Sequence, residues 1–294
     1  MGVGVVESLK EIGRQLDRGV FPKVWDGGIV KPTEHAGSSL TLGAEKSDGK
    51  RAERRPETGS RPGAAGGQGQ AGGSWPAGAA APVFGAEPQA HYEEVLGALA
   101  EAYPGTQLWR QEQGLWLMTR SSVLPGLRRH AMFVTYACFA RKVVRSWAFW
   151  GDPLAAPAWI GPRHTNFPDG SICAFEPTDD TWTFGDALVV LLDLYTVWAL
   201  RHLHLELLGR WPGYQAVAQP YERILELRPD EYCGCGKSSK LYGDCCREKD
   251  LAGDRIGAAV RFFFFSGGRL REPPEPIVRF ACEARNPPVL RELI

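Results

Sequence analysis

Residues 106–150 decide the fold class, and they read TQLWRQEQGLWLMTRSSVLPGLRRHAMFVTYACFARKVVRSWAFW. This stretch holds four short runs with strand character: TQLWR (106–110), GLWLMT (114–119), AMFVTYACFA (131–140) and RSWAFW (145–150). The pairs Gln113-Gly114 and Pro125-Gly126 supply turn residues between runs. We therefore predict a meander of four antiparallel strands.

Helical patterns flank this stretch on both sides. Residues 90–105 place an apolar face on one side of a helix that Pro104-Gly105 ends; its members are Tyr92, Val95, Leu96, Leu99 and Tyr103. A second, long apolar helix is expected from Phe184 to about Leu208. A helix, a run of strands, an irregular loop and another helix predict an α+β domain over residues 89–215, with an antiparallel meander flanked by helices.

The ends of the chain carry simpler patterns. Residues 1–43 contain a short amphipathic helix over 3–18, with apolar side chains at Val6, Leu9, Ile12 and Leu16. Residues 44–88 are rich first in charge and then in Gly, Ala and Pro, which predicts a disordered linker.

The last part of the chain, residues 255–294, is expected to form a β-hairpin tail. The runs AAVRFFFF (258–265) and PIVRFACEA (276–284) flank a Ser266-Gly267-Gly268 turn. Val278, Phe280 and Cys282 alternate with polar or small neighbours, so Cys282 is predicted to be a packed residue.

Composition narrows the class of protein. The chain has 294 residues with 34 basic and 34 acidic side chains, so its net charge gives no support for a nucleic-acid or anionic-membrane partner. The longest apolar candidate for a membrane span, residues 187–200, is interrupted by Asp193 and fits a buried helix better. The N-terminus mixes both charges through its apolar positions and does not resemble a signal peptide, so we expect a cytoplasmic protein.

Four of the seven cysteines crowd into residues 233–246. Cys233 and Cys235 form one close pair and Cys245 and Cys246 another, so four thiolates can meet the tetrahedral demand of zinc. An odd cysteine count with one tight cluster makes a poor disulfide framework. Over residues 221–250 the pattern resembles the SEC-C motif, a small zinc-binding module, and both a structural and a partner-recruiting role stay open.

A single cysteine, Cys173, lies in the loop HTNFPDGSICAFEPTDDTW (164–182). Such a residue is either a small buried side chain after a turn or a nucleophile, and a thiol attacks carbonyls well only as an accessible thiolate. The amide of Asn166 is a candidate donor to an oxyanion. Asp179 and Asp180 are candidates to orient an amine and take its proton. His202 and His204 lie two apart on a helix and therefore on different faces, which argues against a metal pair.

The loop and its surroundings resemble the ubiquitin-conjugating family, in its bacterial branch. The matching residues are His164-Thr165-Asn166, Gly170-Ser171-Ile172-Cys173 and Trp182 before a helix, after a helix and a meander. Thr165 replaces the usual proline, and the interval from His164 to Cys173 is about one residue shorter than in the common eukaryotic form. The resemblance covers about two fifths of the chain.

The resemblance implies a function as well as a fold. Cys173 would accept the C-terminal carbonyl of a ubiquitin-like protein, or of a nucleotide cyclase, as a thioester. Asn166 would stabilise the oxyanion, and His164 would hold the loop in shape. A target protein would be a further partner, and an antiphage operon the setting; whether a separate ubiquitin-activating-like enzyme also takes part stays open. The rival hypothesis is a non-catalytic scaffold of the same fold that binds proteins; a metal-dependent hydrolase lacks a His/Asp/Glu ligand set beside the thiols.

Overall fold

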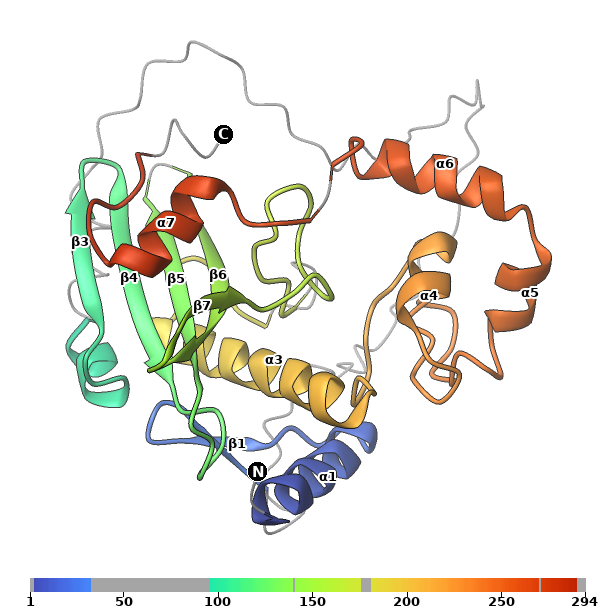
Figure 1. The fold of residues 1–294 in the computed structure, drawn as a ribbon, viewed down its shortest axis with the longest axis horizontal. Coiled ribbons are helices and arrows are strands. Elements are labelled where there is room, and N and C mark those ends of the chain that lie inside the picture. The colour runs from blue at the N-terminus through green and yellow to red at the C-terminus, as the bar shows by residue number, and fades with distance from the viewer. Residues whose placement is uncertain (1–2, 33–95, 140, 176–180, 270, 290–294) are drawn as a thin grey trace, which may run out of the picture.

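A computed structural model describes residues 3–32, 96–139, 141–175, 181–269 and 271–289. The helices in Figure 1 are α1 (Val3–Asp17), α3 (Leu188–Leu208), α4 (Pro220–Glu226), α5 (Arg247–Ala252), α6 (Arg255–Phe265) and α7 (Glu275–Glu283). The strands are β1 (Lys23–Trp25), β2 (Ile29–Lys31), β3 (Gln107–Gln111), β4 (Gly114–Ser121), β5 (His130–Cys138), β6 (Val143–Asp152) and β7 (Ala155–Trp159). The α+β class is confirmed.

The central sheet is an antiparallel meander in the order β3-β4-β5-β6-β7. Its first four strands are those predicted from the aromatic and β-branched runs. The fifth strand, β7, has the sequence AAPAW, whose alanines and Pro157 have low strand propensity. Proline lacks a backbone donor and is tolerated in a sheet at an edge strand, which is where β7 lies.

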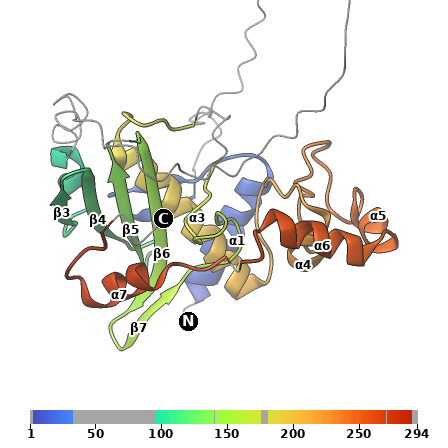
Figure 2. The same ribbon diagram turned by 90° about the horizontal axis from the view of Figure 1, so that it is seen from above.

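Side chains that alternate along the strands pack into two separate hydrophobic cores, one on each face of the sheet. Leu115 and Leu117 of β4 belong to one core together with residues of α3 and α1. Trp116 and Met118 point to the other face and pack with residues of α7. Figure 2 shows α3 and α7 on opposite sides of the sheet, so the domain has three layers.

The five-stranded sheet, the helices α1, α3 and α7 that pack on it and the loop between β7 and α3 are called the sheet domain below, and α3 is its main buried helix. It begins at Leu188, four residues after the predicted start, and ends at Leu208. Gly209 follows as the cap, and its φ of 70° suits a left-handed glycine. The helix is long and apolar enough to cross a membrane by composition alone, but 67% of its most apolar window is buried inside the fold. Burial raises the pKa of Asp193 within it, and a 2.7 Å hydrogen bond from the Tyr103 hydroxyl acts in the opposite direction.

The N-terminal helix is confirmed and belongs to the same core as α3. Leu9, Ile12 and Leu16 of α1 are buried there. The short pair β1–β2 follows, and the Val30 backbone N–H donates to the Val123 carbonyl at 2.8 Å, which ties this hairpin to the sheet domain. Residues 96–102 are helical as predicted, whereas the earlier residues of that helix and the predicted 44–88 linker lie outside the described residues.

The predicted C-terminal β-hairpin is wrong, because both of its segments are helices. Asp254 caps α6 by accepting a 2.8 Å hydrogen bond from the Gly257 backbone N–H, and Pro274 precedes α7. In α7 the buried residues are Ile277, Phe280 and Ala281, which is the spacing of a helical face rather than an alternation. Cys282 is therefore exposed and not packed as the alternating pattern predicted.

Helices α4, α5 and α6 form a group beside the C-terminal end of α3, away from the sheet (Figure 1). Arg223 of α4 and Asp250 of α5 form a buried ion pair, with Arg223 Nε 2.8 Å from a carboxylate oxygen. The four clustered cysteines lie between α4 and the start of α5. This group, residues 217–269, is called the cysteine module below.

Candidate functional site

The loop that carries Cys173 folds back on itself. Thr165 and Ile172 form an antiparallel bridge, and the Asn166 N–H donates to the Ser171 carbonyl at 2.7 Å. The Cys173 N–H donates to the His164 carbonyl at 3.0 Å. Gly170 makes the turn with φ of 64°, and a Cβ there would lie 2.8 Å from the backbone of Glu272. His164, Asn166 and Cys173 are thereby brought together.

The Asn166 side chain is oriented by the loop. Its Nδ2 donates to the Ser171 hydroxyl at 3.2 Å and to the Ile172 carbonyl at 3.1 Å. Both acceptors directly precede Cys173 in the chain. The exposed amide therefore lies next to the cysteine and donates within the loop.

His164 is a neutral, structural side chain. Its Nε2–H donates to Gln215 Oε1 at 3.0 Å, and its ring packs on Trp211 at a centroid distance of 4.5 Å. Burial, followed by the nearby Arg163 guanidinium, lowers the pKa of His164 well below its usual value. The carbonyl of the same residue accepts the Trp198 indole N–H at 2.9 Å. These contacts fit a residue that holds the loop in shape.

A cavity of about 580 Å³ opens beside the loop. Cys173, which is half-buried, lines it together with Asn166 and His164. The facing wall comes from the cysteine module and the segment that follows it, including Val217, Glu222, Glu226, Phe265 and Arg271. The sulfur-bearing loop thus borders a hollow large enough for several side chains. Asp179 and Asp180 lie outside the described residues.

No sequence pattern points to the facing wall of this cavity. Glu222 and Glu226 stand one helical turn apart on α4 and both form ion pairs with Arg271, which follows α6. Arg271 also lies over the ring of Phe167, at 4.5 Å from the centroid. An i, i+4 pair of acids on a short helix is common on protein surfaces, so only the fold identifies these residues as part of a site.

The four clustered cysteines form a candidate metal centre. The sulfur atoms of Cys233, Cys235, Cys245 and Cys246 all lie within 4.8 Å of one another. The distance from Cys245 Sγ is 3.8 Å to Cys235 Sγ and 3.7 Å to Cys246 Sγ. Four sulfurs at about 2.3 Å from a tetrahedral zinc stand about 3.8 Å apart, so these spacings fit the ion. They are far too long for disulfide bonds.

Local backbone geometry builds this centre. Tyr232 and Leu241 form an antiparallel bridge, and the Cys233 N–H donates to the Lys240 carbonyl at 3.0 Å. Gly234 and Gly236 adopt φ of 67° and 73°, which lets the chain turn around the first cysteine pair. The second pair, Cys245-Cys246, directly precedes α5.

The surroundings shift the pKa values of Cys233 and Cys235 in opposite directions. Burial, followed by hydrogen bonds among the thiols, raises the pKa of Cys233. For Cys235, burial also acts to raise the pKa, but the Lys237 backbone N–H and the neighbouring thiols outweigh it and lower the value to about 7. A cation at the centre favours the thiolate form of all four ligands.

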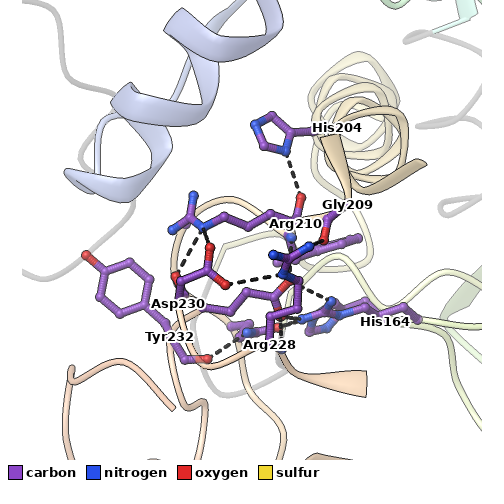
Figure 3. Close-up of polar contacts among 12 residues, drawn as sticks. His164, His204, Gly209, Arg210, Arg228, Asp230 and Tyr232 are labelled. Atoms are coloured by element: carbon purple, nitrogen blue, oxygen red, sulfur yellow. Dashed lines mark hydrogen bonds and ion pairs between the residues drawn. The ribbon is translucent and has the colours of Figure 1, made fainter. Parts of the chain in front are cut away.

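Two sets of contacts connect the cysteine module to the rest of the fold, one at the Cys173 loop and one at the end of α3. Arg163, next to His164, forms an ion pair with Glu231 at 2.6 Å; the side chains are 5% and 0% exposed. In Figure 3, Arg210 and Arg228 link the end of α3 to Asp230: Arg228 donates to the Gly209 carbonyl at 3.0 Å, and Arg210 Nε lies 3.6 Å from the Asp230 carboxylate.

His202 and His204 make structural contacts and do not form a metal pair. His202 Nε2–H donates to the Arg163 carbonyl at 2.8 Å, and His204 Nδ1–H donates to the Arg210 carbonyl at 2.7 Å (Figure 3). Among the described residues, the four cysteines are the group whose ligand atoms converge as a metal requires. No model of a known protein family, no curated protein and no solved structure matches this chain.

Proposed function

We propose that this protein is a ubiquitin-conjugating-like enzyme that carries a protein C-terminus as a thioester on Cys173. The observation that supports the proposal is the position of Cys173 on a cavity of about 580 Å³, beside Asn166 and in a loop held by His164. A sulfur on the wall of a hollow is accessible to a bulky acyl group, which a sulfur inside an apolar core is not.

The reaction has two steps. In transthiolation the Cys173 sulfur attacks the activated carbonyl carbon of the modifier, and the thiol of an activating enzyme leaves. In aminolysis an amine nitrogen attacks that carbon, the carbon–sulfur bond breaks, and the cysteine thiol is regenerated. The two N–H groups of the Asn166 amide donate to Ser171 and Ile172, and one of these bonds would be exchanged for a bond to the oxyanion that forms between these states.

The partners follow from the same proposal. The modifier is a ubiquitin-like protein or the C-terminus of a nucleotide cyclase, an activating enzyme loads it, and a target protein supplies the amine. Zinc bound by Cys233, Cys235, Cys245 and Cys246 is the structural ion. The setting we propose is the cytoplasm of a bacterium, in an antiphage operon.

The test is to identify the atom that carries the modifier. The protein is incubated with activating enzyme, modifier and ATP, and adducts are separated on non-reducing gels. Wild type should give a thiol-sensitive adduct, Cys173→Ser a thiol-resistant oxyester, and Cys173→Ala none; Cys282→Ser is the matched control. An adduct that persists in Cys173→Ala refutes the proposal.

The role of Asn166 is tested in the second step. Asn166→Ala should load normally and discharge about 10²- to 10³-fold more slowly, because losing one oxyanion donor costs about 2.7–4 kcal/mol. Ser171→Ala removes a loop acceptor of Asn166 while keeping the amide, so it separates loop shape from oxyanion stabilisation. Equal slowing in both variants would assign Asn166 to loop shape alone.

A second candidate function is a non-catalytic scaffold, and α6 favours it. Its outer face exposes a row of large apolar side chains, which is typical of protein-binding surfaces: Ile256, Val260, Phe263 and Phe264. A scaffold would keep full biological activity in Cys173→Ala and lose it in Phe264→Asp. An enzyme would lose activity in Cys173→Ala.

A further inference from the structure

Three charged side chains line the cavity beside Cys173 and contact one another. Arg271 pairs with both glutamates of α4: its Nη1 lies 2.8 Å from a Glu222 oxygen, and its Nη2 donates to Glu226. These side chains are largely shielded from water, at 8% exposure for Arg271, 14% for Glu222 and 16% for Glu226. All three line the same hollow as Cys173.

The charges of this group do not balance. Two carboxylates face one guanidinium, which leaves one negative charge at a place where solvent screens poorly. Burial raises the pKa of Glu226, the nearby Arg271 lowers it, and Glu222 raises it again. The net upward direction shows that Arg271 only partly offsets the cost of keeping Glu226 ionised. A second cation would complete the compensation.

Other charged groups near the cavity do not supply that cation. Arg163 is within electrostatic reach of Glu226, but it is paired with the buried Glu231. His164 lines the cavity as a neutral ring. Arg269 lines it too, but its side chain is exposed, so water and salt screen its charge far more strongly than those of the glutamates.

We propose that this cavity binds a primary ammonium group at Glu222 and Glu226 and presents it to Cys173. The occupant is a lysine side chain or another primary amine, since the hollow of about 580 Å³ admits an aliphatic stem and the remaining lining is mixed polar and apolar. The wall that binds the cation comes from the cysteine module, and the wall that holds the thiol comes from the sheet domain.

The identity of this ammonium as the acceptor of the acyl group rests on the proposed function, whereas its binding does not. In aminolysis the ammonium gives a proton to the Glu226 carboxylate, and its nitrogen lone pair forms the bond to the thioester carbon. The carbon–sulfur bond breaks, and the Cys173 thiolate takes the second proton released from nitrogen. A carboxylate whose pKa is raised accepts the first proton more readily.

The experiment uses Cys173 as a reporter of local potential, without any modifier or activating enzyme. Full-length, metal-loaded protein is treated with trimethylammonioethyl methanethiosulfonate or sulfonatoethyl methanethiosulfonate, and adducts on the Cys173 peptide are timed by mass spectrometry. Each thiolate displaces methanesulfinate and forms a mixed disulfide. The rate of modification by the cationic reagent is divided by the rate with the anionic reagent. This ratio is then divided by the same ratio for a small free thiol, which removes the intrinsic difference in reactivity between the two reagents.

Wild type should show a normalised ratio above one. Glu222→Gln and Glu226→Gln, which keep side-chain shape, should each lower the ratio about three- to tenfold, and high salt should reduce the difference. Glu283→Gln, an exposed acid on α7 outside the cavity lining, is the matched control and should leave the ratio unchanged.

Two results overturn the inference: a ratio at or below one in wild type, which would make Arg269 dominant, or an unchanged ratio in both glutamine variants. Metal content and denaturant midpoint measured on the same variants show whether each remains folded. If the ratio behaves as expected but no thioester forms on Cys173, the cation site stands and the proposed conjugating activity fails. The two ideas are therefore separable.

Discussion

The buried ion pair between Arg163 and Glu231 should be a main determinant of stability at the junction between sheet domain and cysteine module. Glu231 is fully buried and accepts from Arg163 at 2.6 and 3.2 Å, from the Trp211 N–H at 2.7 Å and from the Arg228 N–H at 3.2 Å. The carboxylate is thus surrounded by donors. Glu231→Gln removes its charge and turns one oxygen into an amide that faces them.

The expected loss is about 3–5 kcal/mol in the free energy of unfolding, the usual cost of leaving one partner of a buried pair uncompensated. The matched control is Glu206→Gln, which makes the same substitution in the more exposed pair with Arg129; the Glu206 side chain is 47% exposed. That variant should lose less than about 1 kcal/mol. Urea denaturation followed by tryptophan fluorescence measures both values.

A loss in Glu231→Gln no larger than in Glu206→Gln would refute the reasoning. If the single variant does not fold, Arg163→Met with Glu231→Leu provides a second test, because apolar replacement of both partners removes the uncompensated charge. The double variant should be more stable than Glu231→Gln. Alkylation of Cys173 should also be faster in Glu231→Gln, since Arg163 adjoins the His164–Cys173 loop.

Two further predictions concern the metal and the corrected helix. Purified protein should contain about one zinc per chain by elemental analysis. Cys235→Ser and Cys245→Ser should each lose the zinc, and the control Cys282→Ser should keep it. A wild-type protein that folds without metal would contradict the site. Phe280→Ala should lower the free energy of unfolding by about 3–5 kcal/mol, because this buried ring packs against Trp109 and Trp116 with ring centroids 4.9 and 5.6 Å apart. The exposed Phe264 is the control, and Phe264→Ala should lower it by less than about 0.5 kcal/mol. Equal losses would contradict the packing of α7 on the sheet.

The sequence predicts those parts of the fold whose local pattern and tertiary role agree. In β4, Leu115 and Leu117 alternate with Trp116 and Met118, and each set enters a different core. The polar stretch that contains Cys173 likewise predicts an irregular loop between the strands and the long helix, and the structure has one there. In these segments the pattern of neighbouring residues is enough to determine the local structure, so a prediction from a few consecutive residues succeeds.

The C-terminal helices show where such windows fail. The run Phe262–Phe265 has high strand propensity, yet it lies in α6 because Asp254 caps the helix and Phe262 packs on Tyr221 and Phe167. The sequence of α7 fits both an alternating strand pattern, with Val278, Phe280 and Cys282 on one face, and a helical face. Only contact with the sheet decides between these patterns, and Phe280 makes that contact.

The cavity wall was beyond prediction for a related reason. Glu222 acquires a role only when Arg271, far along the chain, returns to pair with it and the Cys173 loop faces them both. Each residue alone is an ordinary charged side chain. The role that we propose for these charges rests on their burial and on their imbalance, and neither is a property of a sequence window.

Val217 connects the cysteine cluster to the cavity beside Cys173. Val217 lines the cavity beside Cys173, and it also packs with Cys233 and the other cysteines in one apolar cluster. Its N–H donates to the Gly234 carbonyl at 2.7 Å, and a Cβ at Gly234 would lie 2.7 Å from that nitrogen. The turn that shapes the first ligand pair therefore also positions a wall of the cavity. A metal that fixes this turn would therefore also fix the wall that carries Glu222 and Glu226 relative to the wall that carries Cys173.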